Sequence, residues 1–447
     1  MAGARADRRP PIARIALADR TILASDHGPV PMNVAAVVVV EQGDDGSDEV
    51  PDTVRRRLAR VPRLRQRLLR PPWGCGAPLW VDDEAHVPGG HLSAGALPAG
   101  AGLQGVLDEA AALVCTPLDP AAPLWTARWL TGWDDTGRRR GALVVVLHHV
   151  VVDGMGGLAV LAALADGGPA LEVGPPAPVP SRRALRRDAW RERRWGIRRA
   201  PGAVAALVAG LRELGMHEGR PRLVARTSLN RPTGGRRRLT CIDVPLADVL
   251  AAARRRGGTV NDLVVVAVVG AMEQVLTTRG ERPDVLVVSV PVSARAAEAA
   301  AALGNSTGVL PVAVPLGLDR EARFAHVAAT TARRRTEQRG ASAAPLGLTF
   351  AALARLGLFR TFVEHQRLVH TFETNLRGPA HPLRLAGREV SAVLPAAVNP
   401  GNVALAFDVL SYAGTLTIVL VSDPDVMRTA DAAAPALLAE LRALTTG

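Results

Sequence analysis

The sequence predicts an α/β fold built in two halves. Short valine-rich runs such as residues 34–40, 142–147 and 285–291 are typical of strands buried on both faces. Runs with helical spacing alternate with them on both sides of a Gly- and Pro-rich stretch at 167–181, which has the composition of an interdomain linker. Because 48% of the 447 residues are hydrophobic, the chain can fill two packed cores.

These observations divide the chain into three segments. We expect an N-terminal half at 1–166, an interdomain segment at 167–238 and a C-terminal half at 239–447. The interdomain segment contains an apolar helical stretch at 200–211, which fits either a crossover helix packed on the body or a helix lying at a membrane surface.

The N-terminal half shows strand and helix patterns in alternation. Val54, Leu58, Val61, Leu64 and Leu68 have helical spacing, and Pro62 should end or kink that helix. The expected elements are, in order, a strand at 34–40, a helix at 49–70, loops with short strands at 71–102, a helix at 103–114, a strand at 125–133, a turn at 134–141, a strand at 142–147 and a helix at 156–165.

The C-terminal half repeats this alternation. Thr259 is suited to cap the N-terminus of a long apolar helix, and residues 411–414 have the composition of a hairpin turn. The expected elements are strands at 239–246, 285–291 and 309–314 and within 403–421, with helices at 247–257, at 261–280 and at the C-terminus.

The positive charge is concentrated in one segment. Residues 181–238 hold 17 arginines and four acidic residues, which more than accounts for the net charge of +12. A basic patch can bind nucleic acid, an anionic membrane or a phosphorylated ligand, or simply be solvated. Aromatic residues make up only 3% of the chain, so we expect no nucleic acid as a partner.

Cysteine usage and the N-terminus favour a cytoplasmic protein. Cys75, Cys115 and Cys241 are too far apart for a disulfide framework or a zinc site, so we expect no bound metal. The first 20 residues lack the apolar core of a signal peptide, and no run of about 18 apolar residues predicts a membrane span.

The strongest local feature is HHVVVDG, from His148 to Gly154. Two histidines end an apolar strand, and Asp153 follows four residues after the second. Buried imidazole and carboxylate groups are costly unless they are hydrogen-bonded or functional. Because neighbouring residues of a strand point to opposite sides, only one histidine should face a cavity and act as a general base. A purely structural corner remains the alternative.

Seven blocks in order resemble the bacterial wax ester synthase/diacylglycerol acyltransferase family, a branch of the CoA-dependent acyltransferase superfamily with the HHxxxDG motif. The opening at 19–40 is similar, except that Asn33 stands where the family usually has His. The other blocks are PLDPAAPLW (117–125), TSLN (227–230) with Arg236–Arg238, TVNDLVVV (259–266), VPVSARA (290–296) with LGNSTG (303–308), TNLRGP (374–379) and LSYAG (410–414).

The resemblance implies two pseudo-symmetric α/β domains with a channel between them. It implies that His149 is the general base, which takes the proton of an acceptor hydroxyl that then attacks the thioester carbonyl of acyl-CoA. His148 would orient the corner, and Gly154 would permit its backbone. Asp153 would point away from the substrate and pair with an arginine of the other half, for which Arg295 is the candidate.

Other residues are expected to support the site. Asn261 and Asp262 either cap a helix or, by resemblance, lie near the channel. Pro123, Leu124 and Trp125 should form packing or a hydrophobic channel wall. Acyl-CoA would be a co-substrate, and we expect no cofactor.

The predicted function is therefore O-acyl transfer from long-chain acyl-CoA to diacylglycerol or a long-chain alcohol, in triacylglycerol or wax ester biosynthesis. Two alternatives remain open: a tailoring or condensation-type acyltransferase acting on a specialised metabolite, and a non-catalytic lipid-binding paralogue. The basic segment 181–238 is the candidate contact with an anionic membrane or lipid-droplet surface, which would make the protein cytoplasmic and peripheral.

Overall fold

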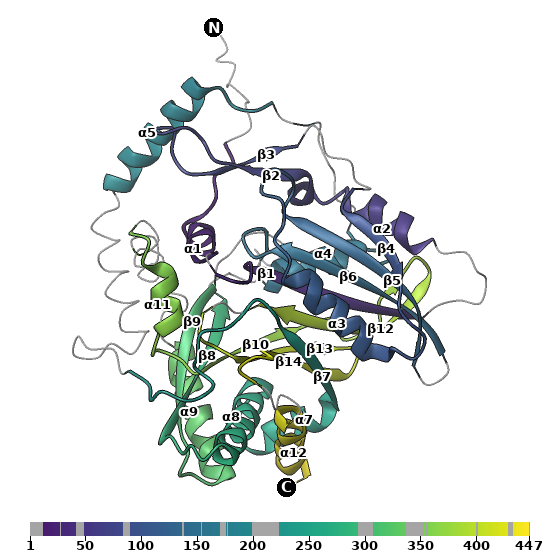
Figure 1. Ribbon diagram of the computed structural model, residues 1–447, viewed down its shortest axis with the longest axis vertical. Helices are drawn as coiled ribbons and strands as arrows, with labels where there is room; N and C mark the ends of the chain where they lie inside the picture. Colours follow the sequence, from purple (N-terminus) through teal and green to yellow (C-terminus); the bar gives the residue numbers. More distant parts are fainter. Residues whose placement is uncertain are drawn as a thin grey trace, which may run out of the picture.

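Two six-stranded sheets occupy the upper and lower parts of the molecule in Figure 1. The computed structural model describes residues 12–26, 28–41, 49–83, 90–135, 138–152, 154–169, 176, 178–198, 223–293, 307–336, 353, 356–398, 401–427 and 432–446. Helices accompany both sheets, so the predicted α/β fold in two halves is confirmed.

The first sheet has the order β11-β12-β1-β6-β5-β4. Its central pair is antiparallel, and the register places Asn33 opposite His148. Residues 141–148 are all buried, as expected for an apolar strand covered on both faces. The strands are β1 (Asn33–Glu41), β4 (Leu92–Ala96), β5 (Trp125–Asp135), β6 (Arg138–His148), β11 (Arg384–Leu385) and β12 (Arg388–Ala397).

The second sheet has the order β7-β14-β13-β10-β8-β9. Strands β8, β10 and β13 run parallel, and β13 and β14 form the predicted hairpin. Its turn holds Ala413 and Gly414 at φ values of 46° and 87°, as a two-residue hairpin loop requires. The strands are β7 (Arg238–Pro245), β8 (Val285–Ser293), β9 (Thr307–Pro315), β10 (Thr371–Arg377), β13 (Leu405–Tyr412) and β14 (Thr415–Ser422).

One strand crosses between the two halves. β12 pairs with β1 along Val34–Val40, although its residues lie deep in the segment predicted as the C-terminal half. Residues 384–397 therefore belong to the first sheet, although they follow the predicted boundary at residue 239. The physical reason is that β1 would otherwise leave an unpaired edge, and a strand from the second half completes its hydrogen bonds.

Helices cover both faces of the first sheet. α2 (Val50–Leu58) and α4 (Gly154–Leu164) share one core with each other and with Val38 of β1. α3 (Gly102–Val114) packs on the opposite face, where its core also includes Leu239 and Val419 of the second sheet. The helix α3 therefore lies at the junction of the two halves.

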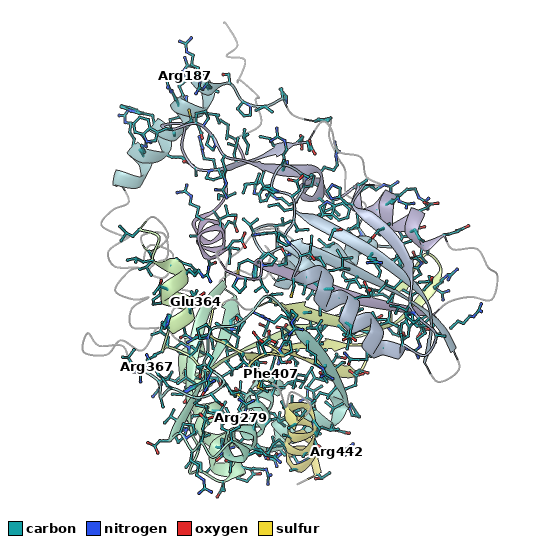
Figure 2. The ribbon with its side chains drawn as sticks, in the orientation of Figure 1. Arg187, Arg279, Glu364, Arg367, Phe407 and Arg442 are labelled. Atoms are coloured by element: carbon teal, nitrogen blue, oxygen red, sulfur yellow. The ribbon has the colours of Figure 1, made fainter. Side chains whose placement is uncertain are left out.

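The second sheet packs its outer face against a helical layer. Figure 2 labels Phe407 on β13, which is fully buried in the core shared with these helices. Of the described residues, only the helix Val260–Thr278 has the length and apolar composition of a membrane span. The most apolar stretch of that helix is 72% buried within the protein, as in a core helix. The layer comprises α7 (Leu246–Arg255), α8 (Val260–Thr278), α9 (Arg320–Thr336) and α12 (Ala433–Thr446).

The segment at 49–70 differs from its predicted helix. The helix α2 ends at Leu58, a 3-10 turn follows at Pro62–Arg65, and residues Gln66–Leu69 form β2, which pairs with β3 (Leu79–Asp82). Pro62 cannot donate the hydrogen bond that would continue the helix. The predicted turn at 134–141 is also shorter, because β5 extends to Asp135 and β6 begins at Arg138.

The interdomain segment is described in part. Residues 182–198 form α5 (Arg182–Arg198), whereas the apolar stretch at 200–211 lies outside the described residues. The remaining described helices are α1 (Leu17–Ser25) and α11 (Phe359–His365).

A buried ion pair fixes the end of the interdomain segment to the second sheet. Arg237 Nη1 lies 3.6 Å from Asp423 Oδ2, and the two side chains are 2% and 0% exposed. The neighbouring pair joins Arg236 to Asp425 at 2.6 Å, but it is open to solvent. The basic segment was expected to be solvated or to bind a phosphorylated ligand. Of its arginines, Arg237 is instead buried in an ion pair, whereas Arg236 is exposed.

We expect Arg237→Met to lower the free energy of unfolding by about 3–5 kcal/mol, because Asp423 would remain buried without its cation. The matched control Arg236→Met should cost at most about 1 kcal/mol, since solvent already screens that pair. Urea denaturation of both variants measures the difference. Equal losses would contradict this account.

Candidate functional site

The histidine corner forms where β6 ends between β1 and β5. The backbone N–H of His148 donates to Leu124 O at 3.0 Å, and that of His149 donates to Met32 O at 2.7 Å. Val151 N then donates to His148 O at 2.8 Å, which closes a turn ahead of α4. The predicted strand, polar corner and helix are therefore confirmed, with Gly154 as the first residue of α4.

Both ring nitrogens of His148 are engaged in hydrogen bonds. The Val150 N–H donates to Nδ1 at 3.0 Å, so Nδ1 carries no proton. The proton of the neutral ring is then on Nε2, which lies 3.1 Å from Asp26 Oδ2. The side chain is buried, at 5% exposure. His148 therefore has no nitrogen lone pair to offer a substrate and acts as a structural anchor.

Asp26 completes this anchor from the other side. Its Oδ1 accepts the Met32 N–H at 2.9 Å while its Oδ2 faces His148. Because Met32 O also accepts the His149 N–H, a single chain of hydrogen bonds links Asp26, Met32 and both histidines. Asp26 was not predicted as a site residue, since nothing in its spacing from HHVVVDG indicates a contact with the motif.

His149 occupies the turn directly after the strand and is half-buried. Its neighbour His148, the last residue of β6, points into the protein toward Asp26. The Nδ1 atom of His149 is buried, so a reacting group would approach the ring from its Nε2 side. The geometry thus assigns different tasks to the two histidines.

Asn33 lies next to His148 in the register and holds α3 in place. Its Nδ2 donates to Val114 O at 3.1 Å and to Thr116 O at 3.0 Å, which satisfies carbonyls at the end of that helix. The asparagine at the position where the resembling family has His is therefore a buried structural residue, at 1% exposure.

The predicted packing element is buried beside the corner. Trp125 Nε1 donates to Leu64 O at 2.7 Å, and the indole stacks on His91 with ring centroids 4.7 Å apart. Pro123 and Leu124 are also buried, and Leu124 O holds the His148 backbone. The group supports the corner through packing and backbone contacts.

Asp262 is a helix-capping residue. Thr259 and Asp262 form a capping box at the start of α8, with Thr259 N donating to Asp262 Oδ2 at 2.8 Å. Asp262 Oδ1 also accepts the Thr331 hydroxyl of α9 at 2.6 Å. The predicted cap at Thr259 is confirmed, and Asn261 lies beside it, half-buried, in the first turn.

Two of the predicted site residues, Asp153 and Arg295, lie outside the described residues. Their pairing stays a prediction. Within the described part of the chain, no group of three or more His, Cys, Asp or Glu is placed to hold a metal ion.

Two buried carboxyl groups were not singled out in the sequence. Burial is the main cause that raises the pKa of Glu373 on β10 to about 8; the Asn375 amide opposes this rise, and the carboxyl groups of Asp408 and Asp262 add smaller increases. Among described residues, neither oxygen of Glu373 makes a hydrogen bond of normal geometry. The available signal was a carboxyl directly before the predicted family block at 374–379.

Asp408 on β13 connects the second sheet to the first. Its Oδ2 accepts the Ala397 N–H of β12 at 2.6 Å. Ala397 is opposite Val34, which is itself opposite Leu147, the residue before the histidine corner. Burial raises the pKa of Asp408 to about 7, although hydrogen bonds from Ala397 and Thr374 favour its charged form.

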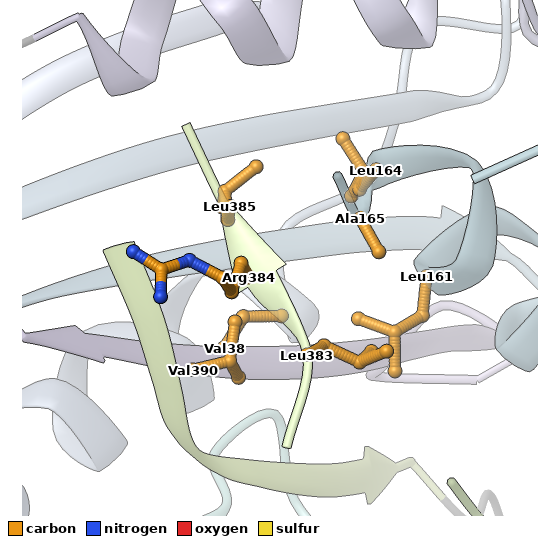
Figure 3. Close-up of a pocket in the computed structure, with 8 residues that line it drawn as sticks. All are labelled: Val38, Leu161, Leu164, Ala165, Leu383, Arg384, Leu385 and Val390. Atoms are coloured by element: carbon orange, nitrogen blue, oxygen red, sulfur yellow. The ribbon is translucent and has the colours of Figure 1, made fainter. Parts of the chain in front are cut away.

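A small apolar pocket lies between α4 and the β11–β12 hairpin (Figure 3). It contains none of the predicted site residues, so it is separate from the histidine corner. Its walls are Val38, Leu161, Leu164, Ala165, Leu383, Arg384, Leu385 and Val390.

Comparisons with known proteins agree on one family. The model of the wax ester synthase/diacylglycerol acyltransferase catalytic domain matches residues 15–264, and the model of the WS/DGAT C-terminal domain matches residues 303–445. The probable diacylglycerol O-acyltransferase tgs1 of Mycobacterium tuberculosis is 28% identical over 423 residues, covering 89% of this chain and 88% of that protein.

Solved structures share the fold. The wax ester synthase/diacylglycerol acyltransferase from Marinobacter aquaeolei VT8 matches with a TM-score of 0.70 at 19% identity, covering 97% of this chain and 99% of that one. A variant of the starter condensation domain of rhizomide synthetase RzmA, solved with C8-CoA and Leu-SNAC, matches with a TM-score of 0.62 at 16% identity and covers 97% and 94%.

We expect Asp26→Asn to lower the free energy of unfolding by about 1–3 kcal/mol. The amide has one acceptor oxygen, so it cannot accept both the Met32 N–H and the His148 Nε2–H, and one buried donor is left without a bond. Thermal and urea denaturation measure the loss. An unchanged midpoint would show that Asp26 does not anchor the corner.

Glu373→Gln should flatten the dependence of stability on pH. The native carboxyl keeps its proton between its ordinary pKa of 4.5 and about 8, whereas the unfolded chain loses it, so wild-type stability falls as pH rises through this window. One such group contributes at most about 1.4 kcal/mol per pH unit. Glutamine does not titrate and removes this contribution.

Urea denaturation between pH 5 and 8 measures the slope. Asp408→Asn is the matched comparison, because its own contribution should end near pH 7. A Glu373→Gln slope identical to that of wild type would show that Glu373 is ionised in the folded protein.

Proposed function

The chain belongs to the wax ester synthase/diacylglycerol acyltransferase family, and from this premise we propose that it transfers a long-chain acyl group from acyl-CoA to the hydroxyl of diacylglycerol or a long-chain alcohol. The products are triacylglycerol or wax ester, with free CoA. The observation that carries the assignment of roles is that both ring nitrogens of His148 are hydrogen-bonded at the end of β6, whereas His149 lies half-buried in the turn that follows.

The proposed reaction needs one base and no covalent enzyme intermediate. His149 accepts the proton of the acceptor hydroxyl, and the oxygen attacks the thioester carbonyl carbon. The tetrahedral intermediate collapses as the C–S bond breaks, and the imidazolium returns its proton to the departing thiolate. A positioned base typically contributes about 10²–10⁴-fold, and the thioester donor is already activated. Acyl-CoA and the acceptor would reach His149 through a channel between the two halves.

His148 and Asp26 serve this step by positioning. Their hydrogen bonds fix the backbone on both sides of His149, which limits how far its ring can move from the reacting hydroxyl. In our proposal Asp153 pairs with Arg295 and steadies the corner from the α4 side, and no cofactor takes part.

The acceptors are insoluble in water, so the protein should work at a lipid surface. We propose a cytoplasmic enzyme that is peripheral to an anionic membrane or lipid droplet, which it contacts through the basic segment 181–238. The charge of that segment supports this view, since cationic segments are attracted to anionic leaflets.

A condensation-type or tailoring activity is the second candidate. The observation in its favour is the structural similarity to the RzmA condensation domain, which was solved with C8-CoA and Leu-SNAC. A preference for short acyl-CoA donors and polar acceptors would distinguish this activity from lipid synthesis.

Release of free thiol from palmitoyl-CoA tests the proposal. We expect release that depends on diacylglycerol or hexadecanol and that falls about 10²–10⁴-fold in His149→Ala. His381→Ala, at an exposed histidine, is the matched control and should retain wild-type turnover.

Full turnover by a folded His149→Ala protein would contradict the proposed base. Release only with short acyl-CoA and polar alcohols would instead support the tailoring enzyme. No release with any donor would leave the non-catalytic lipid-binding paralogue.

A further inference from the structure

The inner face of α5 is fixed to the N-terminal half. Leu185 and Ala189 are each 2% exposed, and Leu185 packs with Cys75 in a small core. Arg14, whose side chain is 4% exposed, lies 2.6 Å from Asp188 and 3.5 Å from Glu192. Both acidic residues of the helix are therefore turned toward Arg14.

The outer face of α5 consequently carries positive charge that no acidic residue of the helix balances. Figure 1 places α5 at the edge of the molecule, and Figure 2 shows Arg187 on it at the end opposite Arg442 of α12. The exposed arginines of this helix are Arg182, Arg183, Arg186, Arg187, Arg191, Arg193 and Arg194.

Two tryptophans are exposed beside these arginines. Trp190 of α5 is 60% exposed, and the Arg194 guanidinium lies 5.2 Å from its ring centroid. Trp73 is 97% exposed on the loop whose Cys75 packs against Leu185. Large aromatic side chains are rarely left in water, whereas tryptophan is favoured at the boundary between lipid and water.

We propose that the outer face of α5, together with Trp190 and Trp73, is the surface that docks the protein on a bilayer of anionic phospholipid. The proposal rests on the proposed function, since a lipid acceptor must be collected from such a surface. The arginines would contact phosphate headgroups, and the two indoles would enter the interfacial layer. A nucleic acid would also attract the arginines but would not require exposed indoles on both the helix and the adjoining loop.

Arg14 sets the orientation of this surface. Its Nη2 donates to Cys75 O at 3.0 Å and to Leu185 O at 3.1 Å, so one buried side chain joins the Trp73 loop to α5. The helix that carries the arginines and Trp190 is therefore joined to the loop that carries Trp73.

Flotation of the full chain with vesicles tests the surface. We expect binding to vesicles of 30% phosphatidylglycerol in phosphatidylcholine and little binding to phosphatidylcholine alone. Charge reversal by Arg183→Glu, Arg187→Glu and Arg194→Glu together should weaken binding at least about 100-fold. The double change Trp73→Ala and Trp190→Ala should weaken it about tenfold with no change in charge.

The matched control reverses three exposed arginines of the second half, Arg254, Arg282 and Arg442, which changes the net charge by the same amount. It should bind vesicles as the wild type does. Equal weakening by both triple variants would show a non-specific charge effect and overturn the proposal. Wild-type vesicle binding by the tryptophan double variant would also overturn the proposal. So would release of the protein from vesicles by RNA added at an equal concentration of negative charge.

The rate of thiol release distinguishes a docking role of α5 from a role in catalysis. With acceptor supplied in detergent micelles, the α5 variants should keep wild-type thiol release, whereas with acceptor embedded in anionic vesicles they should lose it. Loss in both formats would place α5 in the catalytic machinery and overturn the docking role. Absence of turnover in the wild type would refute the proposed function and leave the flotation result intact.

Discussion

The fixed position of the His148 ring is the constraint on which the rest of the site depends. The apolar strand β6 is buried on both faces and ends at His148, and His149 follows in the turn. The His148 ring is anchored by a backbone N–H on one nitrogen and by Asp26 on the other. Because Met32 O accepts the His149 N–H and Met32 N donates to Asp26, the same anchor also holds the backbone of His149.

The two halves of the protein meet through shared elements. β12 leaves the second half to pair with β1, and the Asp408 carboxylate of β13 accepts the Ala397 N–H at its end. The helix α3 packs between the sheets, and Asn33 holds its C-terminal end next to His148. The histidine corner is thus supported from both halves, which suits a reaction that joins two substrates.

Local patterns in the sequence predicted much of the fold. Valine-rich runs identified β1, β6 and β8, the cap at Thr259 identified the start of α8, and the hairpin turn identified Ala413–Gly414. The helix predicted at 49–70 was wrong beyond Leu58, because the expected stop at Pro62 ends it and β2 follows. No pattern predicted the pairing of β12 with β1, since the two strands are more than 340 residues apart in the chain.

Only those site residues that lie close together in the sequence could be predicted. HHVVVDG indicated the corner, but Asp26 is 122 residues from His148, and no periodicity links them. The raised pKa of Glu373 and the buried Arg237–Asp423 pair likewise depend on contacts that form only when distant segments meet. Residue type shows that a side chain is capable of chemistry, whereas burial and partners determine whether it is used for structure.

Chemical rescue by imidazole tests the division of labour between the two histidines most directly. Added imidazole should restore acceptor-dependent acyl transfer to His149→Ala, because that ring supplies only a base on the substrate side of the corner. It should not restore His148→Ala, in which the corner itself loses its anchor. Rescue of His148→Ala, with none for His149→Ala, would contradict the account.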